Sequence, residues 1–460
     1  MSDWLIPLAI TATITVASVC TVLLVWRALH PVSFWLCVGY PVKTAHVYFT
    51  WGNVALGCTL TRKRRRWRYT LDGLPVVGHA TISLAQRRKV RRVQIDKPPR
   101  LGLVRPCRLG FRVNIKLMDG QTPDDYTARL SNLAHAWRVH SVRLIASRPG
   151  RVTLLATRGD PLSEVRTPVL SQGLLRVRVG LLETGAPWVV DFRTVPHWLN
   201  TGATQSGKST LLNALITGLS PQPVALVGFD LKGGVELTAY GPRLSAIATE
   251  RAECVGLLND LICLVKTRMA LCRANKARNV WKLPEHLRPT PVVVLVDEVA
   301  ELFLMAHKGE KDEIATTATA LLRLAQLGRA FGVYLVVCGQ RVGSDLGPGV
   351  TALRSQLSGR ICHRVNDPET ATMTLGDTDP AALDAARQIP ASMPGTAIVV
   401  SDDGRWYRAR SVYVSEEAAE AAATQHAQLA PAWADLLTGT DTVTVTDAEL
   451  EALAREGEPT

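Results

Sequence analysis

The sequence predicts an α/β fold with a parallel sheet, preceded by a small α+β domain and an N-terminal transmembrane anchor. Apolar runs such as residues 292–296 alternate with helical segments, and continuous apolar runs are typical of parallel strands buried on both faces. Residues 202–209 fit the pattern G-x-x-x-x-G-K-[ST], a phosphate-binding loop between a strand and a helix. The uncharged residues 4–26 are long enough to cross a hydrocarbon layer of about 30 Å.

The composition restricts the number of domains and the class of partner. A chain of 460 residues can form two or three domains, each with its own core. The net charge of +13 and the isoelectric point near 9.5 point to a polyanionic partner, which is either nucleic acid or an anionic membrane face. Nine cysteines without a C-x-x-C pair signal neither a disulfide framework nor a zinc site.

Residues 1–60 form the predicted membrane anchor, with one or two spans. Residues 4–26 have tryptophan at both ends and lack the positive start of a cleaved signal peptide, so we expect a retained span. Residues 34–60 are apolar but interrupted by proline, lysine and histidine, and they form either a second span or an interfacial hairpin. The basic run 62–68 then places the rest of the chain on the cytoplasmic side. This run sets topology and attracts anionic lipid, or it contacts DNA.

Residues 61–184 are predicted to form a basic α+β domain. Residues 111–117 alternate like a half-buried strand, and a helix with proline in its first turn follows Thr122. Two strand-like runs flank Pro149 and Gly150 and predict a hairpin. No catalytic constellation is evident in this region, and its basic residues form either a solvated face or a DNA contact.

The phosphate-binding loop gives the strongest indication of function. Its glycines let the backbone curl so that successive N–H groups point at phosphate oxygens, while the following helix adds its positive end. Lys208 would reach the β- and γ-phosphates of ATP, and the Ser209 hydroxyl would bind Mg²⁺. The predicted nucleotide-binding residues are Gly202, Ala203, Thr204, Gln205, Ser206, Gly207, Lys208, Ser209 and Thr210.

Two carboxylates follow the apolar strand 292–296, at the edge where parallel sheets bind ligands. Asp297 would order the ligand shell of Mg²⁺, and Glu298 would polarise the attacking water. The apolar run 333–338 ends near Gln340, whose side chain senses the γ-phosphate, orients water or caps the strand. We therefore predict Lys208, Glu298 and Gln340 as catalytic residues.

Two arginines on the predicted helix 321–330 are candidates for a role across a subunit boundary. Arg323 or Arg329 would stabilise phosphate charge in a neighbouring subunit as an arginine finger, or would form an ordinary surface ion pair. The sequence does not distinguish between the two arginines.

The ordered motifs resemble those of the FtsK/SpoIIIE family of double-stranded DNA translocases. They are residues 196–209, 230–232, 295–298, 325–330 and 339–341, with later similarity at 353–361 and 377–383. The resemblance covers residues 185–414. It implies a RecA-like P-loop NTPase motor that uses ATP and Mg²⁺, works as a homo-hexameric ring and moves double-stranded DNA. One departure is Gln205, where the family usually has glycine.

Three arginines after the glycine-rich turn at 343–349 are the predicted DNA contacts: Arg354, Arg360 and Arg364. Within the family, the short chain, the modest anchor and the basic α+β domain are most similar to the conjugal-transfer (Tra) proteins of actinobacterial plasmids and integrative elements. Residues 415–460 form the predicted acidic tail, with an amphipathic helix at 415–429. The acidic end, 441–460, is too short for the winged helix that chromosome-segregation members usually carry.

The resemblance therefore implies a membrane-anchored, ATP-driven translocase of double-stranded DNA in conjugal plasmid transfer, with its motor on the cytoplasmic side of the cell membrane. The alternatives are a chromosome-segregation translocase, a secretion-system ATPase that moves protein, and a membrane tether whose nucleotide site regulates assembly without translocation. The basic charge favours DNA over protein cargo. Glu298 favours an active ATPase over a tether.

Overall fold

The computed structural model describes residues 5–71, 88–304, 310–343, 346–347, 349–376, 379–400 and 404–439. The chain folds into two compact units, Met1–Pro161 and Leu162–Thr460. This division precedes the expected boundary at 184/185, because strand β8 (Arg176–Leu182) pairs with β17 (Trp406–Ser411) inside the sheet of the second unit. The acidic residues 441–460, parts of the turn 343–349 and Asp377 lie outside the described residues.

The first unit begins with helical segments α1 (Leu5–Leu29), α2 (Pro31–Phe34), η1 (Trp35–Gly39) and α3 (Tyr40–Gly57). Within α1, Thr11–Leu29 is the one helical stretch of the described residues that is long and apolar enough to cross a membrane. Helix α3 instead buries Val47, Trp51 and Ala55 in the core of the small domain. Part of residues 34–60 therefore packs on the small domain, whereas other apolar side chains of this segment, such as Val42 and Phe49, are exposed.

The small domain is an antiparallel sheet with helices on one face. Its strand order is β3-β4-β6-β5, and the β5–β6 hairpin turns at Pro149 and Gly150 as predicted. Phe111, Val113 and Ile115 alternate into the core, where they pack with Trp51 of α3 and Trp137. The elements are β3 (Arg100–Cys107), β4 (Gly110–Lys116), α4 (Pro123–Thr127), α5 (Leu130–Trp137), β5 (Ser141–Arg148) and β6 (Arg151–Thr157).

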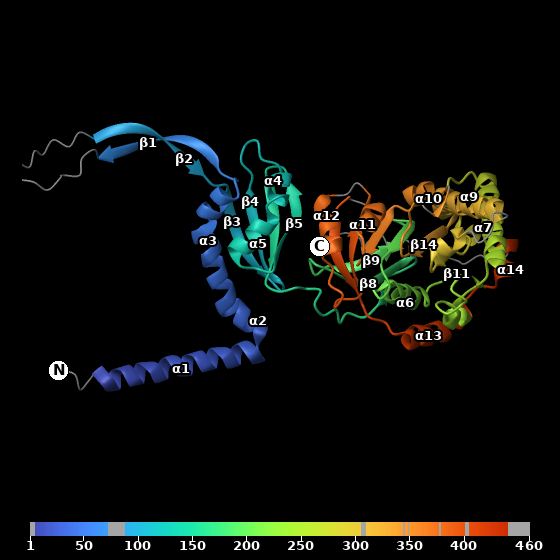
Figure 1. The fold of residues 1–460 in the computed structure, drawn as a ribbon, viewed down its shortest axis with the longest axis horizontal. Helices are drawn as coiled ribbons and strands as arrows, with labels where there is room; N and C mark the ends of the chain where they lie inside the picture. The colour runs from blue at the N-terminus through green and yellow to red at the C-terminus, as the bar shows by residue number, and fades with distance from the viewer. Residues whose placement is uncertain are drawn as a thin grey trace, which may run out of the picture. The chain divides into compact units, whose positions relative to one another are not determined.

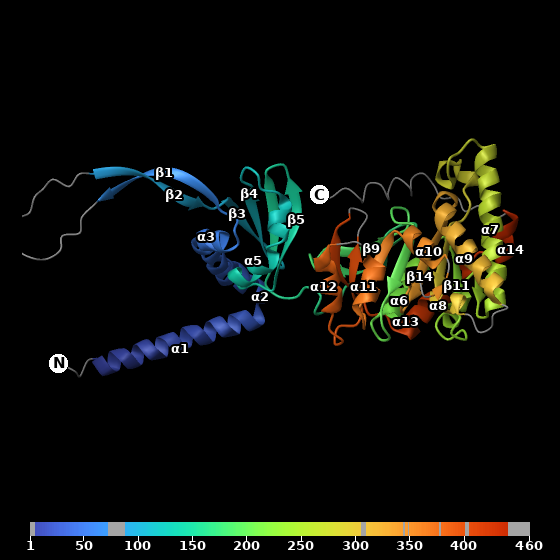
Figure 2. The same ribbon diagram turned by 45° about the horizontal axis from the view of Figure 1, so that its top comes forward.

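A two-stranded antiparallel ribbon projects from this domain (Figures 1 and 2). Its strands are β1 (Arg62–Leu71) and β2 (Arg88–Lys97), so the basic run after the anchor lies on a strand. The ribbon joins β3 directly through Pro98 and Pro99. Proline lacks the backbone donor of a ladder, which explains why the ribbon and the four-stranded sheet are separate sheets.

The second unit is built on an 11-stranded sheet in the order β12-β11-β13-β14-β10-β15-β16-β17-β8-β7, with β9 paired to β8. The first six strands of this order, from β12 through β10 to β15, are parallel to one another, and the remaining strand pairs are antiparallel. Their bounds are β7 (Leu170–Ser171), β9 (Pro187–Asp191), β10 (His197–Thr201), β11 (Ala225–Phe229), β12 (Ala246–Ala248), β13 (Val292–Val296), β14 (Val333–Gly339), β15 (Gly359–His363) and β16 (Thr396–Val400).

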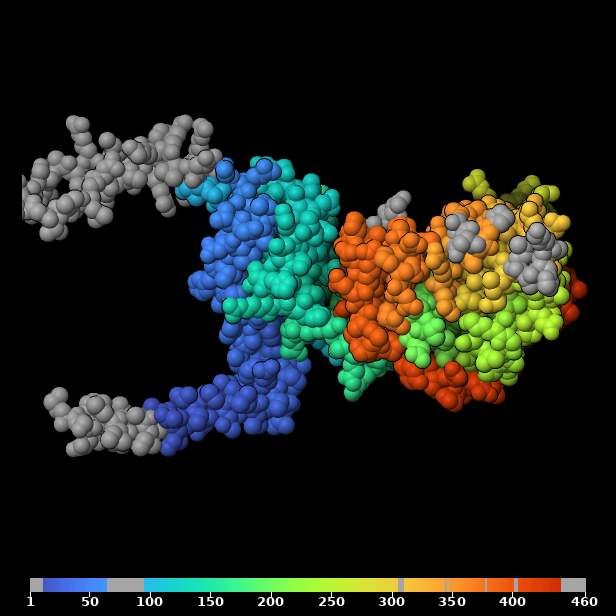
Figure 3. Space-filling model, in the orientation of Figure 1, coloured from blue at the N-terminus to red at the C-terminus, as the bar shows by residue number. Residues whose placement is uncertain are grey.

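Helices cover both faces of this sheet, which is why every residue of β10, β11, β13 and β14 is buried. One face packs on α6 (Lys208–Leu219), η2 (Thr238–Arg243) and α13 (Glu416–Gln425), and Figure 3 shows α13 in red-orange against the green surface of the unit. The other face packs on α7 (Arg251–Ala274), α9 (Lys311–Leu327), α10 (Val350–Gln356) and α14 (Trp433–Thr438). The remaining helices are η3 (Val280–Lys282), η4 (Glu285–Leu287), α8 (Val299–Phe303), η6 (Gly328–Phe331), α11 (Pro368–Leu375), α12 (Pro380–Arg387) and η8 (Ala427–Leu429).

Candidate nucleotide-binding site

The carboxyl ends of β10, β11, β13 and β14 meet around a cavity of about 740 Å³. The phosphate-binding loop follows β10, while Lys232 and Glu236 follow β11, Asp297 follows β13 and Gln340 follows β14. Parallel α/β sheets bind ligands at this edge. The other lining residues include Ser163, Glu164, Val165, Ala391, Pro394, Arg410, Ser411 and Tyr413.

The loop has the backbone geometry of an anion-binding turn. Gly207 has a φ of +112° and is the N-cap of α6, so a backbone conformation that favours glycine leads directly into the helix. Gly395 N donates to Ser206 O at 2.9 Å, and Ala203 N donates to Arg364 O at 2.9 Å. Neighbouring segments therefore hold the loop at two points.

Lys208 is the first residue of α6, and its ammonium lies inside the loop. Nζ donates to the carbonyl oxygens of Gly202 and Ala203, the latter at 3.4 Å. Burial lowers the pKa of Lys208, while the nearby negative charge of Glu298 opposes that shift. The ammonium is thus positioned in the curl of the loop, where it can meet a phosphate.

The two carboxylates after β13 are both buried, Asp297 at 3% and Glu298 at 4% exposure. Lys232 Nζ lies 2.7 Å from Asp297 Oδ2 and neutralises it. Burial lowers the pKa of Lys232, but its hydrogen bond and ion pair with Asp297 outweigh burial, so the pKa is raised overall. Glu298 Oε1 accepts from Gln340 N at 3.2 Å, whereas Oε2 is buried and has no hydrogen-bond partner among the residues that the structure describes. Burial raises the pKa of Glu298, which suits a group that must accept a proton.

The oxygen atoms around Ser209 fit a Mg²⁺ ion. Ser209 Oγ donates to Glu236 Oε2 at 3.1 Å, and the Asp297 carboxylate lines the same cavity. Hydroxyl and carboxylate oxygens are the ligands that Mg²⁺ prefers, together with water and phosphate. The donor set therefore agrees with the metal that the sequence predicts, and adds Glu236 to it.

Two family models match the chain. The actinomycete conjugal transfer protein N-terminal domain matches residues 22–158, and the FtsK/SpoIIIE family matches residues 169–286 and 280–344. Transfer protein TraSA of Streptomyces ambofaciens is 40% identical over 397 residues, which cover 84% of this chain and 92% of TraSA. The chain belongs to the FtsK/SpoIIIE family.

Two further proteins are similar to this chain. A sporulation regulatory protein of Streptomyces azureus is 46% identical over 254 residues, which cover 55% of this chain and 82% of that protein. The pCW3 conjugation coupling protein TcpA, solved as a monomer with ATPγS, is 21% identical with a TM-score of 0.51, and the match covers 70% of this chain and 90% of TcpA. At that identity the likeness shows a shared fold, and it confirms the predicted α/β fold.

Gln205 is the residue at which this chain departs from the usual FtsK/SpoIIIE loop, and its backbone conformation is strained. Its φ is +59°, in the left-handed region. This conformation costs about 1–2 kcal/mol for a residue with a side chain and almost nothing for glycine. The loop therefore holds backbone strain at this residue.

Several residues around the cavity carry no role in the sequence-based prediction. Lys232 and Glu236 lie in a loop that Asp230 holds, because Asp230 Oδ2 accepts from the backbone N–H of Glu236 at 2.8 Å and of Leu237 at 2.7 Å. For Lys232 a signal was present in the family motif at 230–232, although no role followed from the motif alone, whereas Glu236 lies outside that motif. Arg410 and Tyr413 lie far from the loop in sequence and reach the cavity through the antiparallel part of the sheet.

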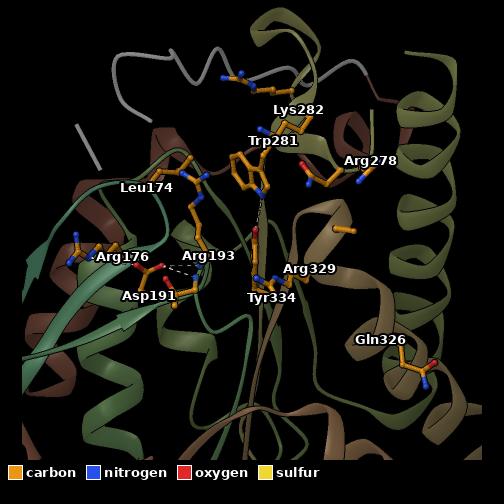
Figure 4. Close-up of a pocket in the computed structure, with 14 residues that line it drawn as sticks. Leu174, Arg176, Asp191, Arg193, Arg278, Trp281, Lys282, Gln326, Arg329 and Tyr334 are labelled. Atoms are coloured by element: carbon orange, nitrogen blue, oxygen red, sulfur yellow. Dashed lines mark hydrogen bonds and ion pairs between the residues drawn. The ribbon is translucent and has the colours of Figure 1, made fainter. Parts of the chain in front are cut away.

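Arg329 lines a second cavity, of about 1000 Å³, which lies near the amino ends of β10 and β14 and therefore at the opposite edge of the sheet (Figure 4). In this cavity the Arg193 guanidinium lies 4.7 Å from the ring centre of Trp281, and Trp281 Nε1 donates to the Tyr334 hydroxyl at 3.1 Å. Arg323 is exposed on α9 and does not line the cavity. Within the described part of the chain, neither Arg323 nor Arg329 forms an ion pair. The cationic lining residues are Arg176, Arg193, Arg278, Lys282, Arg288 and Arg329.

The three arginines predicted to contact DNA do not form one cluster. Arg360 Nη2 donates to Arg354 O at 2.6 Å, so these two residues lie together. Burial, with the adjacent Arg354 charge, lowers the pKa of Arg360 to about 10. Arg364 instead donates to Thr204 O at 3.2 Å and lies at the phosphate-binding loop, because β15 runs parallel to β10 and ends beside it.

Proposed function

We propose that this protein is a membrane-anchored ATPase that translocates double-stranded DNA during conjugal plasmid transfer. The observation that carries this proposal is the single cavity that joins Lys208, Ser209, Asp297 and Gln340, with the Glu298 carboxylate behind it. The similarity to TraSA favours conjugal transfer over chromosome segregation and protein secretion. The apolar stretch Thr11–Leu29 supports an anchor in the cell membrane, with the motor on the cytoplasmic side.

Each residue of the cavity has a distinct task in this proposal. Lys208 and the loop N–H groups would bind the β- and γ-phosphates, and Ser209, Glu236 and Asp297 would hold Mg²⁺. The ion would neutralise phosphate charge when bound. Glu298, whose pKa is raised by burial, would accept the proton of the attacking water. The Gln340 side chain, at the end of the adjacent strand, would orient that water.

The second cavity supports action in a ring. A surface with six cationic side chains and the single carboxylate of Asp191 is suited to an anion. In a homo-hexamer this edge of one subunit would face the nucleotide of the next, and Arg329 would act there as the arginine finger. Arg354 and Arg360 would contact DNA phosphates in the channel, whereas Arg364 would support the nucleotide loop.

The test is ATP turnover by the full chain in neutral detergent, with and without duplex DNA of arbitrary sequence. DNA should stimulate turnover irrespective of its sequence, because the contacts are to phosphate. Arg329→Ala should lower turnover by about 1,000-fold or more while leaving ATP affinity unchanged. Arg323→Ala, which removes an exposed arginine outside the cavity, is the matched control and should retain activity. Absence of stimulation by DNA at low salt would contradict the proposal and favour a protein-moving ATPase or a tether.

A further inference from the structure

The four-stranded sheet of the small domain carries its basic residues on one face. Its strands contain seven arginines and lysines and no aspartate or glutamate. On β4, Phe111, Val113 and Ile115 are buried under the helices, while Arg112 and Lys116 point to the opposite face and are exposed. The other five cations share that opposite face through their pairing: Arg100, Arg105, Arg143, Arg148 and Arg151.

Four of these cations lie side by side across all four strands. Arg100 pairs with Lys116, Lys116 with Arg151, and Arg151 with Arg148. We call these residues the cationic row. All four are exposed, and none of them forms an ion pair with any described residue. Strands lie about 4.8 Å apart, so the row extends about 14 Å.

The cationic row is unfavourable for folding by itself. Like charges directly opposite each other on neighbouring strands destabilise a sheet, and the row contains three such pairs in succession. Folding gives no reason for this arrangement, whereas a polyanionic ligand would neutralise it. The charges therefore indicate a binding surface.

A hollow continues the row toward the β1–β2 ribbon. It has a volume of about 650 Å³ and is lined by Arg62, Lys63 and Lys97 of the ribbon together with Arg100 and Lys116 of the row. Asp119 is the one carboxylate among its described lining residues. The ribbon extends the same charge, because its two strands carry eleven arginines and lysines against the single Asp96.

We propose that the cationic row and the adjoining hollow form a second binding site for the phosphate backbone of double-stranded DNA, outside the motor domain. Anionic lipid offers the same phosphate chemistry. However, α3, which is the helix joined to the anchor, packs on the opposite face of the sheet. The row therefore lies on the face of the sheet away from α3, the helix that leads to the anchor, and this favours DNA over lipid.

The inference rests on the proposed handling of DNA by the motor, and it concerns a separate site. Lys116→Gln with Arg151→Gln removes the two central charges of the row. Each phosphate contact contributes about 0.9 to the slope of log affinity against log salt, so the slope should fall by about 2. ATP turnover without DNA should stay unchanged, and the thermal midpoint should not fall, because the repulsion within the row is reduced.

The matched control is Arg129→Gln with Arg138→Gln, which makes the same change in net charge at exposed residues that flank α5, on the helical side of the sheet. The control should keep the wild-type salt slope. Binding is measured with the full chain in neutral detergent micelles, by the anisotropy of a labelled duplex of arbitrary sequence.

Three outcomes would overturn the inference in different ways. An unchanged slope in the Lys116 and Arg151 variant, with normal binding by the wild type, would remove this site and leave the motor proposal intact. If the Lys116 and Arg151 variant no longer binds vesicles of phosphatidylglycerol, while its salt slope for DNA binding stays that of the wild type, the row would be assigned to lipid. Failure of the wild-type chain to bind any duplex would contradict the proposed function itself.

Discussion

Replacing Gly207 by alanine tests the geometry of the phosphate-binding loop. A Cβ at this position would lie 2.2 Å from the Gly395 nitrogen and 2.4 Å from its Cα, and both are backbone atoms. The loop would therefore have to move away from the segment that holds it. Gly233→Ala is the matched control, because Gly233 also has a positive φ, +74°, but has open space around the added Cβ.

Both variants have the left-handed strain of about 1–2 kcal/mol, and only Gly207→Ala adds an overpacking cost of about 1–3 kcal/mol. If that cost falls on the loop, Gly207→Ala should bind ATP about 5- to 150-fold more weakly than Gly233→Ala. The assay is titration with a fluorescent ATP analogue, combined with thermal melting to show that each variant is folded. Equal affinities in the two variants would refute the loop geometry described above.

Three further predictions follow from the same contacts. Glu298→Gln should bind ATP and fail to hydrolyse it. Burial raises the pKa of Glu298, so the wild type loses stability as pH rises from the ordinary glutamate range through the raised pKa. In thermal melting at neutral pH, the midpoint of the variant should therefore equal or exceed that of the wild type. Gln205→Gly should retain ATP binding. Its free energy of unfolding should be about 1 kcal/mol larger than that of the wild type, seen as a higher melting temperature, because the left-handed strain is removed. Deletion of residues 1–29 should leave the small domain folded and resistant to limited proteolysis. Deletion of 1–61 also removes Trp51 from the core of that domain, and its free energy of unfolding should fall by about 3–5 kcal/mol or more.

The nucleotide loop and the two carboxylates could be predicted because each is a continuous stretch with one chemical meaning. Lys232 and Glu236 could not be assigned roles in this way, because only the pairing of β11 with β13 brings Lys232 beside Asp297 and both residues to the same cavity. Arg364 illustrates the same limit: in sequence it belongs with Arg360, while the parallel pairing of β15 with β10 places it at the loop.

The N-terminal region shows a second limit, since apolar composition does not identify the partner that buries it. Val47 and Trp51 could have faced lipid as well as protein, and only the fold of the sheet shows that they pack on it. The cationic row depends on strand register, because its four residues are spread over β3, β4, β5 and β6. The sequence therefore predicted that this domain is basic, but not which of its basic residues share one surface.

Displacement of a third DNA strand from a duplex tests translocation most directly. The full chain in neutral detergent is given a duplex with a triplex-forming strand at one end, with ATP and Mg²⁺, and release of that strand is followed over time. We expect release that depends on ATP and is absent in Glu298→Gln, which still binds nucleotide. Wild-type protein that hydrolyses ATP in the presence of the duplex but never releases the strand would contradict translocation of DNA.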